Sequence, residues 1–320
     1  MYKIDELLQK AKTVAISGHV RPDGDCVGSV MALYLYIKKN MPEIQAKVFL
    51  EKPSDVFYCI PGVEDIDTVM ESREVYDIFF VLDTAADRIG NACPIYERAK
   101  LKVNIDHHIS NPGTGDINIL VPQGSSTSEV VYRNIDPKKL DSSIAMAIYM
   151  GIAHDTGVFK YSNTTPDTLR AVAHLMEYGF DFSKLIDETF YEKTYHQNQI
   201  MGRAMLESIR FMEGKCVVST VTKKMMDFYH VTAGDLDGII NQLRIIKGVE
   251  CAIFLYQVGE MEYKVSLRSN SYVNVSVVAS YFGGGGHIRA AGCTMKGTPH
   301  DVINNLSARI SLQMEKKDKK

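Results

Sequence analysis

With 320 residues, of which 45% are hydrophobic and 23% charged, the chain is long enough for two globular domains at roughly 100–200 residues each. Its net charge of −3 argues against the broad basic surface with which proteins bind long nucleic acids, so we expect no long nucleic acid as a partner. The lack of a long apolar run and the six scattered cysteines, typical of reduced thiols, predict a cytoplasmic protein without membrane contact.

Short β-rich runs alternate with helical patterns through the first half of the chain. The run 77–82 is nearly all apolar, as in a strand that is buried on both faces. Strands that alternate with helices predict an α/β domain, a parallel sheet with helices on both faces. Strands are expected at 12–17, 46–50, 77–82 and 101–105, and helices at 25–39, 125–134, 142–154 and 164–179.

The pattern changes in the second half, where a largely polar helical stretch at 182–212 precedes a smaller α+β domain. Strands are expected there at 216–221, 251–258 and 262–267, a helix at 233–245, and a helix or a strand at 276–282. The predicted domains are therefore 1–190 and 213–320, joined by a helical linker at 191–212. We expect the lysine-rich end, 314–320, to be disordered.

Polar side chains gather directly after the first predicted strand. The segment HVRPDGD contains a proline and a glycine that favour a tight turn, which can bring His19, Asp23 and Asp25 together. A histidine with two carboxylates is a ligand set suited to Mn²⁺, Mg²⁺ or Zn²⁺. The alternative is an ordinary turn in which Asp25 caps the following helix.

The same residue types follow other predicted elements. Asp83 ends the apolar run 77–82, the triplet Asp106, His107 and His108 follows the strand 101–105, and Asp155 ends an apolar helix. Each of these alone can be a cap or a satisfied polar end. Because the carboxyl ends of parallel strands meet at one edge of a sheet, we expect these side chains to converge there.

Charge balance favours two cations over one. The four carboxylates of Asp23, Asp25, Asp83 and Asp155 would repel one another, and some would take up protons, unless cations lay between them. Two divalent ions neutralise four carboxylates. A carboxylate such as Asp83 can bridge two ions about 3.5–4 Å apart.

These motifs resemble the four motifs of the DHH phosphoesterase superfamily, in the same order. The late segment GGGGHIRAAG, which begins at Gly283, resembles the glycine-rich signature of the associated DHHA1 domain. The order, the spacing and the total length are similar to the bacterial nanoRNase/pAp-phosphatase (NrnA-like) subfamily, over about residues 13–295.

The resemblance implies two divalent cations, with Mn²⁺ expected and Mg²⁺ or Co²⁺ as alternatives. One cation would be bound by His19, Asp23, Asp83 and Asp155, and the other by Asp25, Asp83, His107 and Asp155. It further implies that Asp106 orients a histidine and that His108 faces the scissile phosphate. Relatives often have a small residue where this chain has Cys26, which we expect to be a buried thiol and not a ligand.

Candidate substrate contacts lie mainly in the second predicted domain. Consecutive glycines can present backbone N–H groups to an anion, although a flexible linker is the alternative. The resemblance suggests that Arg268 binds a terminal phosphate, which arginine can hold with two hydrogen bonds; the alternative is a surface arginine on an edge strand. The full set of candidates is Arg268, Ser269, Gly284, Gly285, Gly286, His287 and, in the first domain, Arg88.

The other notable polar residues have simpler structural explanations. We expect the hydroxyl-rich run 124–129 to cap the helix that it opens, and His154 to be a core residue.

The expected function is metal-dependent hydrolysis of short oligoribonucleotides to mononucleotides and removal of the 3′-phosphate from 3′-phosphoadenosine 5′-phosphate (pAp). The alternatives are a phosphodiesterase of linear or cyclic dinucleotides, a single-strand exonuclease, a type II inorganic pyrophosphatase, and a nucleotide-binding regulator without catalysis. The sequence leaves the oligomeric state open, with a homodimer as one candidate.

Overall fold

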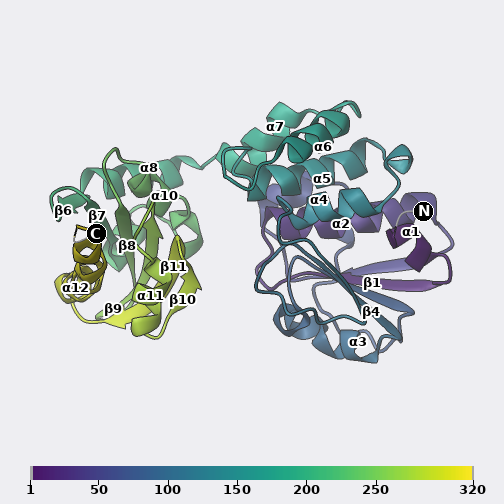
Figure 1. Cartoon of the computed structure of the whole chain (residues 1–320), viewed down its shortest axis with the longest axis horizontal. Helices are drawn as coiled ribbons and strands as arrows, with labels where there is room; N and C mark the ends of the chain where they lie inside the picture. The colour runs from purple at the N-terminus through teal and green to yellow at the C-terminus, as the bar shows by residue number, and fades with distance from the viewer. Residues whose placement is uncertain (1–2, 319–320) are drawn as a thin grey trace. The chain divides into compact units, whose positions relative to one another are not determined.

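The computed structural model describes residues 3–318, which divide into two compact units between Glu192 and Lys193 (Figure 1). The first unit is α/β and contains a parallel sheet, and the second contains a mixed sheet with helices on both faces. The predicted fold class is thus confirmed. Among the described residues, no helix combines the length and the apolar character that crossing a membrane requires.

The sheet of the first unit has the order β2-β1-β3-β4-β5, and all of its neighbouring strands are parallel. Because β2 and β3 lie on opposite sides of β1, the strand order reverses at β1. Ligands of open α/β sheets bind beyond the carboxyl ends of the strands at such a reversal. The strands are β1 (Thr13–Ser17), β2 (Gln45–Phe49), β3 (Ile78–Leu82), β4 (Leu101–Asp106) and β5 (Ile117–Leu120).

Helices cover both faces of this sheet, with α2, α4 and α5 on one face and α3 on the other (Figure 1). Helices α2 and α5 cross closely at two glycines, since a Cβ at Gly28 would lie 2.8 Å from the backbone nitrogen of Gly151. The helices are α1 (Lys3–Leu8), α2 (Gly24–Asn40), α3 (Cys93–Arg98), α4 (Thr127–Asn134), α5 (Ser142–Asp155), α6 (Pro166–Met176) and α7 (Phe182–Ile186).

The second unit has a six-stranded sheet in the order β10-β11-β9-β8-β7-β6, in which only β7 and β8 pair in parallel. Two buried clusters lie on its opposite faces, one with α8 and α10 and the other with α11 and α12. The strands are β6 (Ile209–Phe211), β7 (Cys216–Val221), β8 (Cys251–Gly259), β9 (Glu262–Ser269), β10 (Gly285–His287) and β11 (Ala290–Lys296). The helices are α8 (Tyr195–Leu206), α9 (Lys223–Phe228), α10 (Ile239–Arg244), α11 (Val275–Tyr281) and α12 (Pro299–Asp318).

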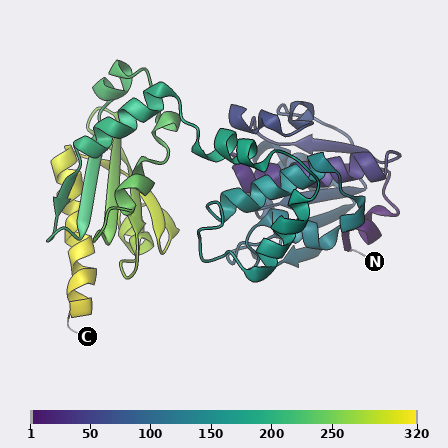
Figure 2. The ribbon, with the colours of Figure 1, turned by 90° about the horizontal axis from the view of Figure 1, so that it is seen from above.

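The structure differs from two expected helices and from the expected disorder at the end of the chain. The stretch 182–212 is broken, because a π-helical turn follows α7 and a new helix, α8, begins at the capping box of Thr194 and Gln197. The stretch 233–245 is interrupted at Gly238, whose φ of 88° lies outside the helical region. The part of 314–320 that the structure describes belongs to α12, which runs along the second sheet in Figure 2; residues 319–320 lie outside the described part.

Candidate metal centre

The six predicted metal ligands lie together at the carboxyl edge of the first sheet. His19 follows β1, Asp25 stands in the first turn of α2, and Asp83 follows β3. His107 follows β4, and Asp155 is the last residue of α5. The remaining candidate, Asp23, is the N-cap of α2, where its Oδ1 accepts hydrogen bonds from two backbone N–H groups.

His19 presents a ring nitrogen to two carboxylates. Its Nδ1 lies 2.9 Å from the carbonyl oxygen of Val20, so this nitrogen is the donor and Nε2 is left with its lone pair in the neutral ring. The Nε2 atom lies 3.5 Å from Oδ2 of Asp83 and 3.6 Å from Oδ1 of Asp23. Three electron-rich atoms therefore face one small volume.

His107 repeats this arrangement on the other side of Asp83. Its Nδ1 lies 3.3 Å from the carbonyl oxygen of Gly124, again leaving Nε2 to face carboxylates. The Nε2 atom lies 3.5 Å from Oδ2 of Asp155, 3.7 Å from Oδ1 of Asp83 and 3.9 Å from Oδ2 of Asp25. Asp155 is thereby grouped with His107.

These spacings fit cations better than hydrogen bonds. The distances of 3.5–3.9 Å are too long for direct hydrogen bonds. Neighbouring ligand atoms that each lie about 2.1 Å from one ion are roughly 3.0–3.7 Å apart, a range that includes these pairs except His107 Nε2 and Asp25 Oδ2 at 3.9 Å. Asp83 turns Oδ2 toward His19 and Oδ1 toward His107, so one carboxylate faces both volumes.

The buried carboxylates favour positively charged partners. Asp25 and Asp83 are 2% and 3% exposed. Burial and the neighbouring Asp25 raise the pKa of Asp83 well above its ordinary range, and burial likewise raises the pKa of Asp25. Burial and the charge of Asp25 raise the pKa of Asp155 to about 7. Carboxylates in this state are ionised readily only beside cations, so the donor set fits a divalent metal.

The backbone at Asp83 is held in an uncommon conformation. Its φ of 61° lies in the left-handed region, which aspartate tolerates better than most residues. The N–H of Asp83 donates to the carbonyl oxygen of Ile105 at 3.0 Å, which fixes this turn against β4. The sheet thus determines where the carboxylate of Asp83 points.

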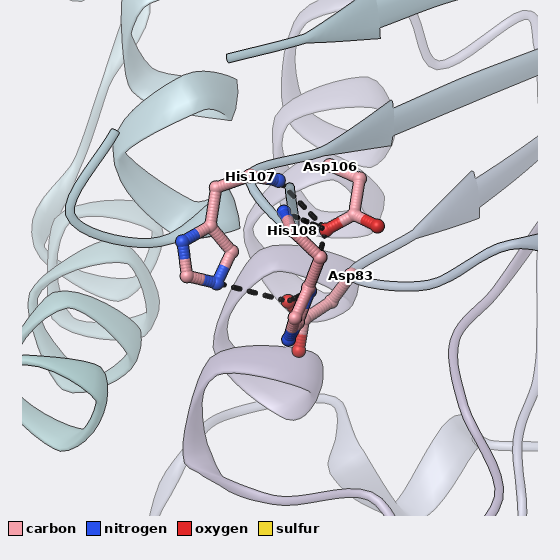
Figure 3. Close-up of side chains that lie close together, drawn as sticks. All are labelled: Asp83, Asp106, His107 and His108. Carbon is pink, nitrogen blue, oxygen red and sulfur yellow. Dashed lines mark hydrogen bonds and ion pairs between the residues drawn. The ribbon is translucent and has the colours of Figure 1, made fainter. Parts of the chain in front are cut away.

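Asp106 orients the two histidines that follow it (Figure 3). Its Oδ1 accepts from the backbone N–H of His107 at 2.7 Å and from Nδ1–H of His108 at 2.8 Å. Its Oδ2 accepts from the amide of Asn111 at 2.6 Å. The hydrogen bond with Asp106 raises the pKa of His108 to about 9, so His108 is a cation at neutral pH, with Nε2 available as a donor.

Three other candidates lie close to the cluster. Cys26 is buried as expected, although its Sγ, together with donor atoms of His19 and Asp83, forms a group in which all atoms lie within 4.8 Å of one another. His154 packs between Phe57 and Phe190, and burial lowers its pKa to about 4, as for a core histidine. Arg88 is exposed, and its carbonyl oxygen accepts from the N–H of Val20, beside His19.

The residues that donate hydrogen bonds to the candidate ligands were not identified from the sequence. The run 124–129 does contain a helix cap, Ser126, but the next residue, Thr127, donates its hydroxyl to Oδ1 of Asp83 at 2.9 Å. The amide of Asn163 donates to Ser125 O at 2.8 Å and lies 3.4 Å from Oδ2 of Asp155. Nothing in the sequence distinguished these polar residues from ordinary caps and turns.

The substrate candidates of the second unit lie at one corner of its sheet. Arg268 is paired with Ala290 across β9 and β11, and Gly285 and Gly286 belong to the edge strand β10. A Cβ at Gly284 would lie 2.2 Å from a backbone oxygen, whereas a Cβ at Gly285 would meet nothing within 4 Å. Close packing therefore requires a glycine at Gly284, whereas Gly285 has room for a side chain and packing does not account for the glycine there.

The other two candidates of this corner differ in exposure. His287 is exposed at the end of β10. Ser269 is buried and donates its hydroxyl to the carbonyl oxygen of Val273 at 2.6 Å, so its contact with substrate stays a prediction.

Comparison with known proteins assigns both units. Residues 13–152 match the DHH family, N-terminal domain, and residues 213–316 match the DHHA1 domain. A bifunctional oligoribonuclease and PAP phosphatase NrnA of Thermus thermophilus is 31% identical over 294 residues, which cover 90% of this chain and 86% of the relative. The protein of the same description in Bacillus subtilis is 28% identical and is covered to 89%, with 88% of this chain aligned.

One solved structure is similar over nearly the whole length. The crystal structure of an exopolyphosphatase-related protein of Bacteroides fragilis has a TM-score of 0.88 and 26% sequence identity, covering 96% of this chain and 94% of its own. Both domain matches, the relatives and the cluster of buried carboxylates and histidines agree. The chain belongs to the DHH family of metal-dependent phosphoesterases, in the nanoRNase/pAp-phosphatase subfamily that carries a C-terminal DHHA1 domain.

Proposed function

We propose that this protein hydrolyses short oligoribonucleotides to mononucleotides and removes the 3′-phosphate of pAp, with two divalent cations, Mn²⁺ being preferred. The similar proteins of Thermus thermophilus and Bacillus subtilis carry both activities in their names. The observation that carries the proposal is the carboxylate of Asp83, whose two oxygens face Nε2 of His19 and Nε2 of His107. This division of one carboxylate between two histidines supports two metal positions.

Each metal position would have its own set of ligands. His19, Asp23, Asp83 and Asp155 would hold one cation, and Asp25, Asp83, His107 and Asp155 would hold the other. Bound divalent cations supply Lewis-acid activation of the phosphoryl group and of the attacking water. The buried, hydrogen-bonded carboxylates hold this arrangement without reorganising during the reaction.

His108 is proposed to contact the scissile phosphate. It is the most exposed histidine of the cluster, with 36% of its side chain accessible, against 13% for His19 and for His107. Since Nδ1–H is held by Asp106, Nε2–H can donate to a phosphoryl oxygen or to the leaving ribose oxygen. Asp106 fixes the orientation of this ring.

The second unit is proposed to carry contacts for the substrate's phosphates. Arg268 is proposed to hold a terminal phosphate, and the open space at Gly285 admits an anion close to the backbone. His287, Ser269, Gly284, Gly286 and Arg88 complete the proposed contacts. A net charge of −3 suits substrates with few phosphates.

The test is a product time course with Mn²⁺ on 5′-labelled ribonucleotides of different lengths and on pAp. We expect mononucleotides from the short RNAs, phosphate from pAp, and much slower turnover of a 24-mer. The variant His108→Ala is expected to lower kcat by about 10²–10⁴-fold, the usual contribution of a proton-transfer group. Undiminished turnover in this variant would remove His108 from the proposal.

The same assay separates the alternative functions. Faster turnover of a cyclic dinucleotide than of linear RNA and pAp would favour a dinucleotide phosphodiesterase. Rapid digestion of the 24-mer would favour a single-strand exonuclease, and rapid release of phosphate from pyrophosphate would favour a pyrophosphatase. Tight nucleotide binding without any turnover would indicate a regulator.

A further inference from the structure

The start of α4 donates hydrogen bonds to two carboxylates of the proposed metal site. The backbone N–H groups of Thr127 and Ser128 donate to Oδ2 and Oδ1 of Asp25, at 2.6 and 2.9 Å. Asp25 thus receives one hydrogen bond on each oxygen, and each oxygen keeps a lone pair for another partner. The turn that begins α4 fixes the plane of this carboxylate.

Thr127 reaches a second carboxylate with its side chain. Its Oγ1 lies 2.9 Å from Oδ1 of Asp83 and 3.5 Å from Oδ1 of Asp106. An ionised carboxylate can accept hydrogen bonds but cannot donate them, so the hydroxyl is the donor. Its single proton goes to the closer oxygen, Oδ1 of Asp83. Thr127 is 0% exposed, so water does not compete for this hydroxyl.

One residue therefore contacts the ends of three elements. Its amide holds Asp25 at the start of α2, and its hydroxyl holds Asp83 after β3 and lies beside Asp106 at the end of β4. We infer that Thr127 is a positioning residue that orients Asp25 and Asp83 together and so links the affinities of the two cation positions. This inference rests on the proposed metal site.

A role in metal positioning differs from a role in folding or in substrate contact. Groups that orient metal ligands typically change metal affinity or activity by about 10–100-fold when they are removed. The hydroxyl can be removed while the amide is kept, because valine has nearly the shape of threonine. Thr127→Val therefore deletes only the bond to Asp83, and Thr127→Ser restores a donor without the methyl group.

The experiment is a calorimetric titration of the metal-free protein with Mn²⁺, alongside steady-state kinetics at saturating Mn²⁺. We expect Thr127→Val to weaken Mn²⁺ binding by about 10–100-fold at both positions, and Thr127→Ser to recover most of it. Ser219→Ala is the matched control, since it removes a buried hydroxyl that bonds Ala204 O at 2.7 Å in the second unit. It is expected to leave Mn²⁺ affinity unchanged.

Three results would overturn the inference. Wild-type affinity in Thr127→Val with a raised KM would assign the hydroxyl to substrate contact. Equal weakness of Thr127→Ser and Thr127→Val would assign the effect to the methyl group. Weakening at one position alone would contradict the linkage. If Thr127→Val does not fold, as judged by circular dichroism, Thr127→Ala takes its place with the same expected loss. A wild-type protein that binds no Mn²⁺ would contradict the proposed function itself.

Discussion

At the scale of single residues, the candidate site depends on carboxylates that are buried at the carboxyl edge of the first sheet. Asp83 is the clearest case, because it is 3% exposed, has a left-handed backbone and lies between two histidine rings. The six candidate ligands could be proposed from the sequence because Asp or His recurs directly after several predicted elements whose ends meet at one edge of the sheet. Thr127 could not, because a threonine near a helix start is ordinary and its bond to Asp83 joins residues 44 positions apart.

Asp83→Asn tests the role of this carboxylate. The change removes a buried charge that Asp25 repels, so the metal-free variant should be at least as stable as the metal-free wild type. Excess Mn²⁺ at about 100 times its Kd should stabilise the wild type by about 2.7 kcal/mol and the variant by much less. Melting curves with and without Mn²⁺ check this, and an equal shift of Tm in both proteins would exclude Asp83 as a ligand.

At the scale of secondary-structure elements, the site depends on how closely α2, α4 and α5 approach one another. Periodicity predicted these helices, because their apolar residues recur at helical spacing. The helix α12 was not predicted, although its buried residues Val302, Leu306, Ile310 and Met314 recur at every fourth position, as in a helix with one buried face. Nor could periodicity predict close crossing points, which only a three-dimensional arrangement reveals.

Gly151→Ala tests the closest of these approaches. A Cβ at Gly151 would lie 1.9 Å from Oγ of Ser128, 2.7 Å from its Cβ and 2.8 Å from Oδ1 of Asp25, so either α5 or the Ser128 and Asp25 side chains must shift. We expect the variant to lose about 1–3 kcal/mol of stability and most of its Mn²⁺-dependent activity. Gly202→Ala in α8 is the control, because nothing lies within 4 Å of its Cβ position. That substitution should raise stability slightly.

Asp77 joins the amino ends of three strands, and its effect depends on pH. Its carboxylate accepts from Lys100 Nζ and Lys12 N, both at 2.8 Å, and from Thr13 N at 3.1 Å, which lowers its pKa. The stability it contributes is present above the ordinary pKa of aspartate, about 3.9, and is lost as the pH falls toward the lowered value.

Asp77→Asn should therefore cost about 1 kcal/mol near pH 7 and much less in strong acid. Melting temperatures of both metal-free proteins, measured from pH 7 to pH 2, check this prediction. A gap in Tm that stays constant over this range would contradict the assignment.

At the scale of the whole molecule, the chain contains a metal-binding unit followed by a second unit that carries the proposed substrate contacts. The domain order could be predicted because the two sequence signatures lie far from each other in the chain. The first lies among alternating strands and helices, and the second lies in the α+β pattern of the second half. The boundary was harder to predict, because the polar stretch at 182–212 divides into short helices that belong to both units.

Arg268→Ala tests the contribution of the second unit. Losing a charge-assisted contact to a phosphate should raise KM for pAp and for short RNA by roughly 10–100-fold, with Mn²⁺ affinity unchanged. Arg210→Ala is the matched control, because Arg210 lies on β6, at the opposite edge of the same sheet from β10. Equal effects of the two changes on KM would argue against a phosphate site at Arg268.

The central claim is that six side chains of the first unit hold two divalent cations around Asp83. Anomalous diffraction from a crystal grown with Mn²⁺ measures this directly. We expect two manganese peaks about 3.5–4 Å apart. One peak should lie next to Nε2 of His19 and the other next to Nε2 of His107, with Asp83 between them. A single peak, or manganese bound away from Asp83, would contradict the account.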